Sequence, residues 1–138
     1  MTPLFGYGTF HNPAWRRAIL GADYPARAAQ LHGWRRAVLA SGYLTLIRDE
    51  RHSAPPVAGV LLDLDDAGWR IADAWEEVPR YHRIAVRVES ARGSVDAIAY
   101  VTAEQRSAQA LADELLAALD DAVVEAAIAR FVATGRRA

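Results

Sequence analysis

The chain has 138 residues, 52% of them hydrophobic, which fits one globular domain with a single apolar core. Its net charge of −1 provides no electrostatic footprint for nucleic acid or an anionic membrane, and the absence of cysteine excludes disulfide scaffolds, thiol catalysis and cysteine metal sites. All 16 basic residues are arginine, so a lysine nucleophile or Schiff base is also excluded.

The start of the chain predicts a protein without a signal peptide. Its first residues carry no basic n-region and no long apolar run. No stretch approaches the roughly 18–20 continuous apolar residues that a membrane-spanning helix needs. We therefore expect a cytoplasmic location.

The first half of the chain predicts strands with one early helix. A short strand over residues 4–7 ends in glycines, and Asn12 with Pro13 is typical of a helix start. Gly21 is expected to end that helix. We predict one strand over residues 28–39, a short β run over 43–47 and a buried strand over 57–64, which is almost continuously aliphatic.

The second half predicts a short helix, a hairpin and a helical tail. Asp65 and Asp66 begin a helical stretch over residues 67–77, and alternating strands over 80–89 and 95–101 flank a turn at Gly93. From residue 102 the pattern is helical, with an apolar stripe that recurs every four residues, and Gly135 is expected to cap it. The stripe fits either a core helix or a homodimer contact.

These elements predict an α+β fold with a small mixed β-barrel-like sheet and flanking helices. We expect residues 1–101 to form the main domain and residues 102–138 a C-terminal helical extension packed on it.

Two segments carry residues suited to chemistry. In the glycine turn, residues 6–10, two glycines would let backbone N–H groups approach a ligand and form an anion nest. Farther on, Trp75 offers an apolar wall beside Glu76, and desolvation there would raise the pKa of the carboxyl group, as a general acid/base requires. Taken alone, each segment also fits a purely structural role.

The order of several short motifs is more specific than any one of them. A strand followed by Tyr7, Gly8, Thr9 and Phe10 matches the pattern Tyr-Gly-Ser/Thr-Leu. A Gly-Tyr/Phe-Arg pattern follows over residues 33–35, and a Val-x-Gly-x-Leu pattern over residues 57–61.

The last motif surrounds the candidate carboxylate. Residues 72–77, Ala-Asp-Ala-Trp-Glu-Glu, follow roughly the pattern Leu-Asp-x-Phe-Glu-Gly, and a Tyr and an Arg come next, here Tyr81 and Arg83. The ordered set, over about residues 4–101, resembles the gamma-glutamylcyclotransferase-like superfamily, including its avirulence-induced-like and small bacterial members. The chain departs from it at Phe10, where Leu is usual, and at Glu77, where Gly is usual.

The resemblance implies a small-molecule enzyme that converts a gamma-glutamyl amide to 5-oxoproline and a free amine. It implies Glu76 as the catalytic acid/base and no cofactor or metal. The expected substrate-binding residues are Gly6, Tyr7, Gly8, Thr9, Phe10 and Tyr81. Asp73 is expected to have a structural role, and Arg83 to be solvated or paired with a carboxylate.

Other functions stay open on the same scaffold. They are amide hydrolysis, removal of a gamma-glutamyl cap during small-molecule biosynthesis, and a non-enzymatic binding module whose working part is the C-terminal helix. The four histidines have no metal-ligand spacing, although His11 and His82 lie beside the two segments and could line a cleft.

Overall fold

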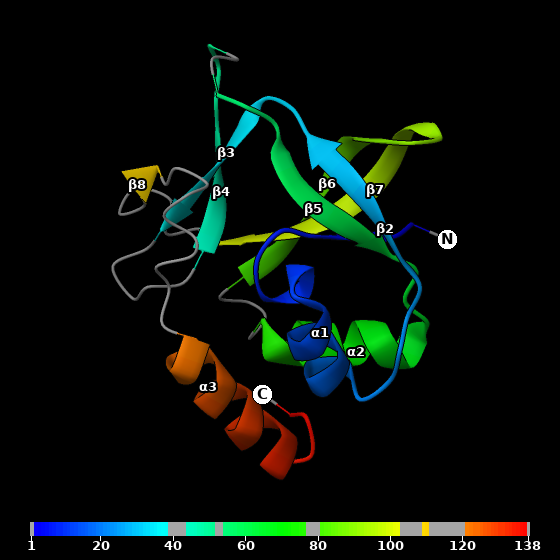
Figure 1. The fold of residues 1–138 in the computed structure, drawn as a ribbon, viewed down its shortest axis with the longest axis vertical. Helices are drawn as coiled ribbons and strands as arrows, with labels where there is room; N and C mark the ends of the chain where they lie inside the picture. The colour runs from blue at the N-terminus through cyan, green and yellow to red at the C-terminus, as the bar shows by residue number, and fades with distance from the viewer. Residues whose placement is uncertain are drawn as a thin grey trace.

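The structure is a computed structural model that describes residues 2–38, 44–51, 54–76, 81–102, 109–110 and 121–137. Its strands and helices form two layers, with the helices gathered at one end of the strands (Figure 1). In chain order the elements are β1 (Leu4–Gly6), the 3-10 helix η1 (Thr9–His11), α1 (Pro13–Leu20), β2 (Ala26–Leu31), β3 (Trp34–Val38), β4 (Leu44–Arg48), β5 (Val57–Leu62), α2 (Asp66–Trp75), β6 (Tyr81–Ser90), β7 (Gly93–Thr102), β8 (Gln109–Ala110) and α3 (Asp121–Ala133).

Five strands close into a barrel in the order β1-β5-β2-β6-β7. The closing contact is the parallel pairing of β1 with β7, where Leu4 lies opposite Ile98 and the Ile98 N–H donates to the Pro3 carbonyl at 2.9 Å. The predicted hairpin is confirmed as β6 and β7, which pair along their full length. The predicted α+β class with a barrel-like sheet is therefore confirmed.

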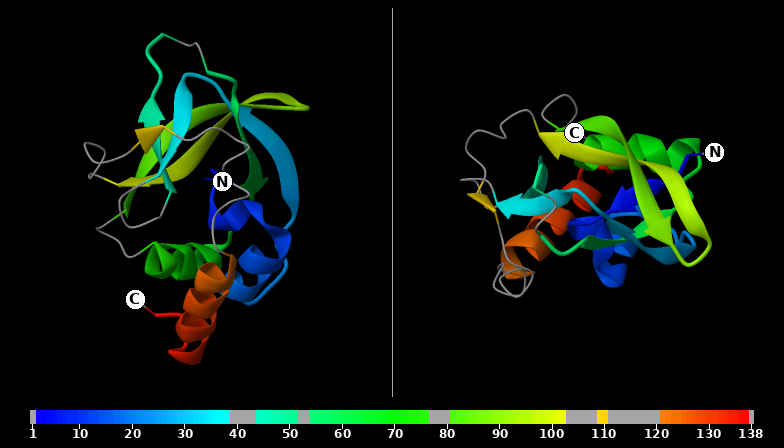
Figure 2. Two further views of the ribbon diagram at one scale, coloured as in Figure 1. Left: turned by 60° about the vertical axis from the view of Figure 1, so that its left-hand side comes forward. Right: turned by 90° about the horizontal axis from the view of Figure 1, so that it is seen from above.

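The remaining strands form a second sheet in the order β4-β3-β8. Further views show this sheet standing to one side of the barrel, with α3 against α1 on the helical side (Figure 2). The single strand predicted over residues 28–39 is wrong, because Gly33 adopts a left-handed φ of 82° and divides it into β2 and β3. A turn there sends the two halves into different sheets.

The helix boundaries follow the predicted caps. Asn12 accepts a hydrogen bond from the Trp15 N–H at 3.1 Å, Pro13 opens α1, and Gly21 ends it in the left-handed conformation. The Asp65 carboxylate accepts from the Gly68 N–H at 2.7 Å and caps α2. These short-range interactions are the ones that local sequence specifies.

The C-terminal helix α3 packs on the helical layer. Its buried Ile128 and Phe131 join the core cluster of α1 and α2, and Gly135 ends it at a φ of 77°. Beyond the cap, the Arg136 guanidinium donates to the carbonyls of Ile19 and Ala18 at 3.0 and 3.2 Å. The end of α3 is thereby tied to the end of α1.

The prediction of helix from residue 102 onward is wrong at Thr102, which ends β7, and at residues 109–110, which form β8 and pair with β3. The rest of that stretch up to α3, residues 103–108 and 111–120, lies outside the described residues. On α3, the side chain of Val123 is 61% exposed, and the homodimer contact expected along this helix stays a prediction. The division into residues 1–101 and 102–138 also stays a prediction.

None of the helices in the described ranges is long and apolar enough to cross a membrane. The cytoplasmic location stays a prediction.

The close pairing of β1 with β5 leaves no room for a side chain at Gly59. A Cβ there would lie 2.6 Å from the Gly6 carbonyl oxygen and 2.7 Å from the Phe5 ring. We expect Gly59→Ala to lower the free energy of unfolding by about 1–3 kcal/mol, because the barrel must shift to relieve the overlap. Denaturant unfolding measures this, with Ala58→Ser, at an exposed position of the same strand, as the control. An unfolding midpoint equal to that of the control would contradict the packing.

Candidate active site

The glycine turn, residues 6–10, leaves the barrel at the end of β1 and folds back at once. A Cβ on Gly6 would lie 2.8 Å from the Phe10 Cβ, so the close approach requires glycine. Phe10 itself is buried in the core cluster beneath the turn. The predicted contact of Phe10 with substrate stays a prediction, and the burial gives its side chain a packing role.

Few of the described residues come near Gly8. Of the atoms described, only the Leu44 Cδ1, at 4.0 Å, would come near a Cβ on Gly8. Within the described residues, the backbone N–H groups of Gly8 and Thr9 donate no hydrogen bond, whereas the Gly8 carbonyl accepts from the His11 N–H at 3.0 Å. The turn therefore presents two amide donors beside a position that lacks a side chain.

A buried arginine holds the turn from below. The Arg36 Nε donates to the Tyr7 carbonyl at 3.0 Å, and its Nη2 donates to the Ala58 carbonyl on β5. Only 3% of Arg36 is exposed, so this cation is desolvated and depends on its acceptors. The Gly-Tyr/Phe-Arg pattern in the sequence includes Arg35 and not Arg36. The one sequence feature that indicates a buried Arg36 is its position as a charged residue inside an apolar strand.

The Tyr7 side chain is part of a buried chain of hydrogen bonds. Its hydroxyl donates to the Tyr100 carbonyl at 2.5 Å and interacts with the Thr45 hydroxyl, which accepts from the Thr102 N–H at 3.2 Å. Burial raises the pKa of Tyr7 well above its usual value, and the negative charge of Glu76 raises it further. Tyr7 therefore stays neutral, and the carboxylate of Glu76 lies close enough to act on it.

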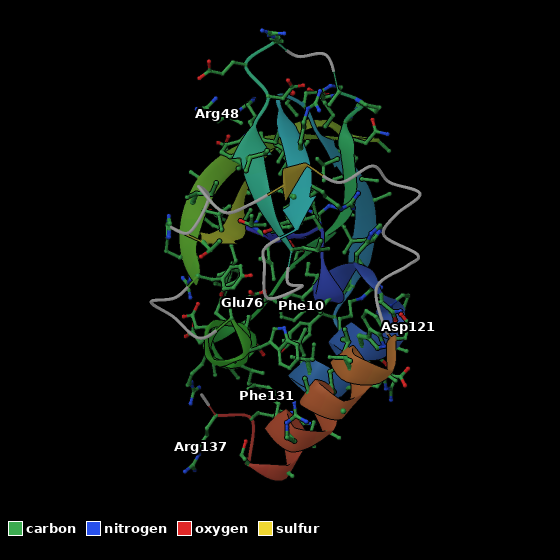
Figure 3. All side chains as sticks on the ribbon, turned by 90° about the vertical axis from the view of Figure 1, so that its left-hand side faces the viewer. Phe10, Arg48, Glu76, Asp121, Phe131 and Arg137 are labelled. Atoms are coloured by element: carbon green, nitrogen blue, oxygen red, sulfur yellow. The ribbon has the colours of Figure 1, made fainter. Side chains whose placement is uncertain are left out.

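Glu76 caps the C-terminal end of α2. Its N–H donates to the Ala72 carbonyl at 3.0 Å, and its side chain is half-buried. The neighbouring Trp75 connects it to the turn, because the indole Nε1–H donates to the Thr9 Oγ1 at 3.0 Å. Figure 3 shows Glu76 and Phe10 in the region between the strands and the helices. Glu77 lies outside the described residues.

The last turn of α2 is braced by Asp73. Its carboxylate accepts two hydrogen bonds from Arg83, at 2.9 and 2.6 Å, and one from the Tyr100 hydroxyl at 2.5 Å. The Arg83 guanidinium also lies 4.4 Å from the centre of the Trp69 ring. Asp73 therefore has a structural contact network, and Arg83 pairs with a protein carboxylate.

Tyr81 opens β6 on the same side. Its side chain is buried, and its hydroxyl donates to the Leu44 carbonyl at 3.1 Å. Tyr81 lies close enough to Tyr7 to raise its pKa, as a smaller cause than burial and the charge of Glu76. The structure thus gathers Tyr7, Tyr81 and Glu76 in one place, while contact between Tyr81 and substrate stays a prediction.

The histidines contribute less. Partial burial, followed by the charges of Arg36 and Arg16, lowers the pKa of His11. His82 is exposed on β6. Across the part of the chain that the structure describes, no group of three or more His, Asp or Glu side chains could hold a metal ion.

These observations define a class of domain: a closed five-stranded barrel in which a glycine turn lies near a carboxylate. The family model for gamma-glutamyl cyclotransferase, AIG2-like, matches residues 4–120. The chain belongs to this family. The match extends past residue 101, where the motifs visible in the sequence end.

Solved structures share the fold. A protein from Arabidopsis thaliana is 26% identical over 98% of this chain and 79% of its own length, with a TM-score of 0.66. An AIG2-like protein from Mus musculus is 23% identical over 84% of this chain and 82% of its own, with a TM-score of 0.59. A gamma-glutamyl cyclotransferase is 14% identical over 79% and 69%, with a TM-score of 0.60. Among curated proteins, no match is found.

Replacing Arg36 tests the support of the turn. In Arg36→Met the carbonyls of Tyr7 and Ala58 lose a charged donor, and we expect a cost of about 1–3 kcal/mol for each carbonyl left unpaired. Denaturant unfolding gives the free energy. Arg87→Met is the matched control, because its ion pair with Asp96 is exposed and should contribute within about 1 kcal/mol. Equal losses in both variants would contradict the role of Arg36.

The buried Tyr7 predicts a loss of stability in alkali. Since its pKa is raised in the folded state, its contribution is complete below the unfolded value of about 10 and is lost as the pH rises above it. The free energy of unfolding should fall by up to about 1.4 kcal/mol per pH unit for this group. Denaturant unfolding between pH 9 and about 11 should show a shallower fall in Tyr7→Phe. Equal slopes in both proteins would show that Tyr7 is not protected.

Proposed function

We propose that the protein is a gamma-glutamyl cyclotransferase that converts a gamma-glutamyl amide to 5-oxoproline and a free amine. The observation that supports this most directly is the meeting of the glycine turn with Glu76, through the hydrogen bond from Trp75 to Thr9 and the charge of Glu76 near Tyr7. Membership of the family supports the same reaction class.

The reaction is intramolecular and needs no protein nucleophile or cofactor. The nitrogen of the substrate α-amine forms a bond to its own γ-carbonyl carbon, and the bond from that carbon to the amide nitrogen breaks. Holding the substrate folded in the attacking geometry can supply up to about 7–11 kcal/mol of the barrier. The main task of the site is therefore to fix a flexible substrate.

The turn is suited to bind the negative charges of the substrate. The amides of Gly8 and Thr9, which have no acceptor among the described residues, would donate with that of Tyr7 to the substrate carboxylate or to the developing oxyanion. Because Gly8 carries no side chain and few described atoms lie near its Cα, the backbone there can approach a ligand closely. Loss of one oxyanion donor costs on the order of 10²–10³ in rate.

Glu76 would move the proton. The α-amine must lose a proton before it attacks, and the leaving amine must gain one, so a single carboxylate can perform both transfers in turn. Its place at the C-terminal end of α2, directly after Trp75, holds it beside the turn where both transfers would take place.

Amide hydrolysis and removal of a gamma-glutamyl cap would use the same turn and carboxylate. They differ in whether water or the substrate's own amine attacks, so 5-oxoproline distinguishes them from cyclisation. A binding module would show no turnover and would lose its partner when residues after 102 are removed.

Replacing Glu76 tests the proposal. The purified protein is incubated with gamma-glutamyl amino acids, gamma-glutamylamines and glutathione, and 5-oxoproline is measured by mass spectrometry. We expect turnover of at least one substrate, with a loss of about 10²–10⁴ in Glu76→Gln, because the proton can no longer be transferred.

Glu77→Gln is the matched control and should remain active. Loss of activity in Glu77→Gln, but not in Glu76→Gln, would move the assignment by one residue. A wild-type protein that forms no 5-oxoproline from any substrate of the panel would refute cyclisation.

A further inference from the structure

We propose that Phe131, Trp75 and Thr9 form a clasp through which the C-terminal helix α3 positions the glycine turn against Glu76. Trp75 is the positioning residue at its centre. This inference deepens the proposed function and depends on it. It assigns a role in the site to a helix that lies far from the turn and from Glu76 in the sequence.

The first link of the clasp joins the two halves of the site. The Trp75 indole N–H donates to the Thr9 hydroxyl oxygen at 3.0 Å, across 66 residues of sequence. The pattern Leu-Asp-x-Phe-Glu-Gly has a phenylalanine at the position of Trp75, and a phenylalanine carries no such donor. Because Trp75 immediately precedes Glu76, this hydrogen bond fixes the backbone that carries the carboxylate relative to the turn.

The second link joins Trp75 to α3. The rings of Trp75 and Phe131 meet edge to face, with centroids 5.3 Å apart and an angle of 77° between their planes. Phe131 is 9% exposed and lies in the same core cluster as Phe10. In Figure 3, Phe131 lies on α3, on the opposite side of α2 from the strands. Its ring restricts the orientation in which the indole can donate to Thr9.

The helix that carries Phe131 is itself anchored. Arg136 binds the last carbonyls of α1 through two hydrogen bonds, and Ile128 is buried against the same layer. The turn leads directly through η1 into α1, so α1 and α3 hold the clasp from both ends. A fixed α3 therefore restricts both partners of the Trp75–Thr9 hydrogen bond.

The functional consequence is geometric. The turn binds the substrate and Glu76 transfers the proton, so the distance between them must suit a proton transfer over a hydrogen bond. A displacement of about 1 Å can reduce the rate by about a hundredfold. The clasp should therefore act on kcat more than on KM, because the turn amides still bind the substrate when the link to Glu76 is weakened.

Trp75→Phe keeps the ring and removes the N–H donor. We expect kcat for 5-oxoproline formation to fall by about 10–100-fold with KM changed by less than about threefold. Trp34→Phe, on β3 and against the other core cluster, is the matched control and should keep the wild-type kcat. Thr9→Val should reproduce the loss and Thr9→Ser, which retains the acceptor, should restore activity. Phe131→Leu should lower kcat, whereas Val132→Ala on the same helix should not.

The hydrogen bond has its own readout, the ¹H–¹⁵N resonance of the Trp75 indole, which Trp75→Phe identifies by its disappearance. We expect this resonance to shift and its hydrogen exchange to accelerate in Thr9→Val. Unchanged resonance and exchange in Thr9→Val would overturn the clasp, even if the variants are less stable. An active wild type with an unaltered kcat in Trp75→Phe would overturn the positioning role alone. A wild type without turnover refutes the proposed function, and the positioning role with it.

Discussion

The buried guanidinium of Arg36 is the constraint on which the site depends. A cation that is 3% exposed must find acceptors inside the protein, and two of those are the backbone carbonyls of Tyr7 and Ala58. These hydrogen bonds hold the glycine turn against β5. Gly59 also lets β5 lie close to Gly6, so the turn is fixed by packing and by charge together.

The other half of the candidate site comes from α2, and the position of this helix is set by contacts at both ends. Asp65 caps the first turn, whereas Asp73 in the last turn is held by Arg83 and Tyr100. Since Tyr100 also accepts from the Tyr7 hydroxyl through its carbonyl, one strand residue contacts both halves. The carboxylate of Glu76 therefore faces the turn from a braced helix end.

The helical layer completes this arrangement. Trp75 contacts Thr9 through its N–H and Phe131 through its ring, so the same side chain belongs to the core and to the edge of the site. Such a residue contributes to stability and to geometry at once. Activity and folding are then best separated by variants that retain the ring and change only the hydrogen bond.

The sequence by itself determined the features that short-range physics governs. Local residue patterns predict the caps at Asn12 and Asp65, the β6–β7 hairpin and the buried β5. The ordered motifs, which include the glycine turn and Glu76, indicated the family to which the chain belongs. Only the tertiary structure decided that Gly33 divides one apolar stretch between two sheets and that residues 109–110 join β3. It also decided which of two adjacent arginines is buried, and that Trp75 joins Thr9 to Phe131. These outcomes depend on contacts between distant segments, whose partners a local pattern does not contain.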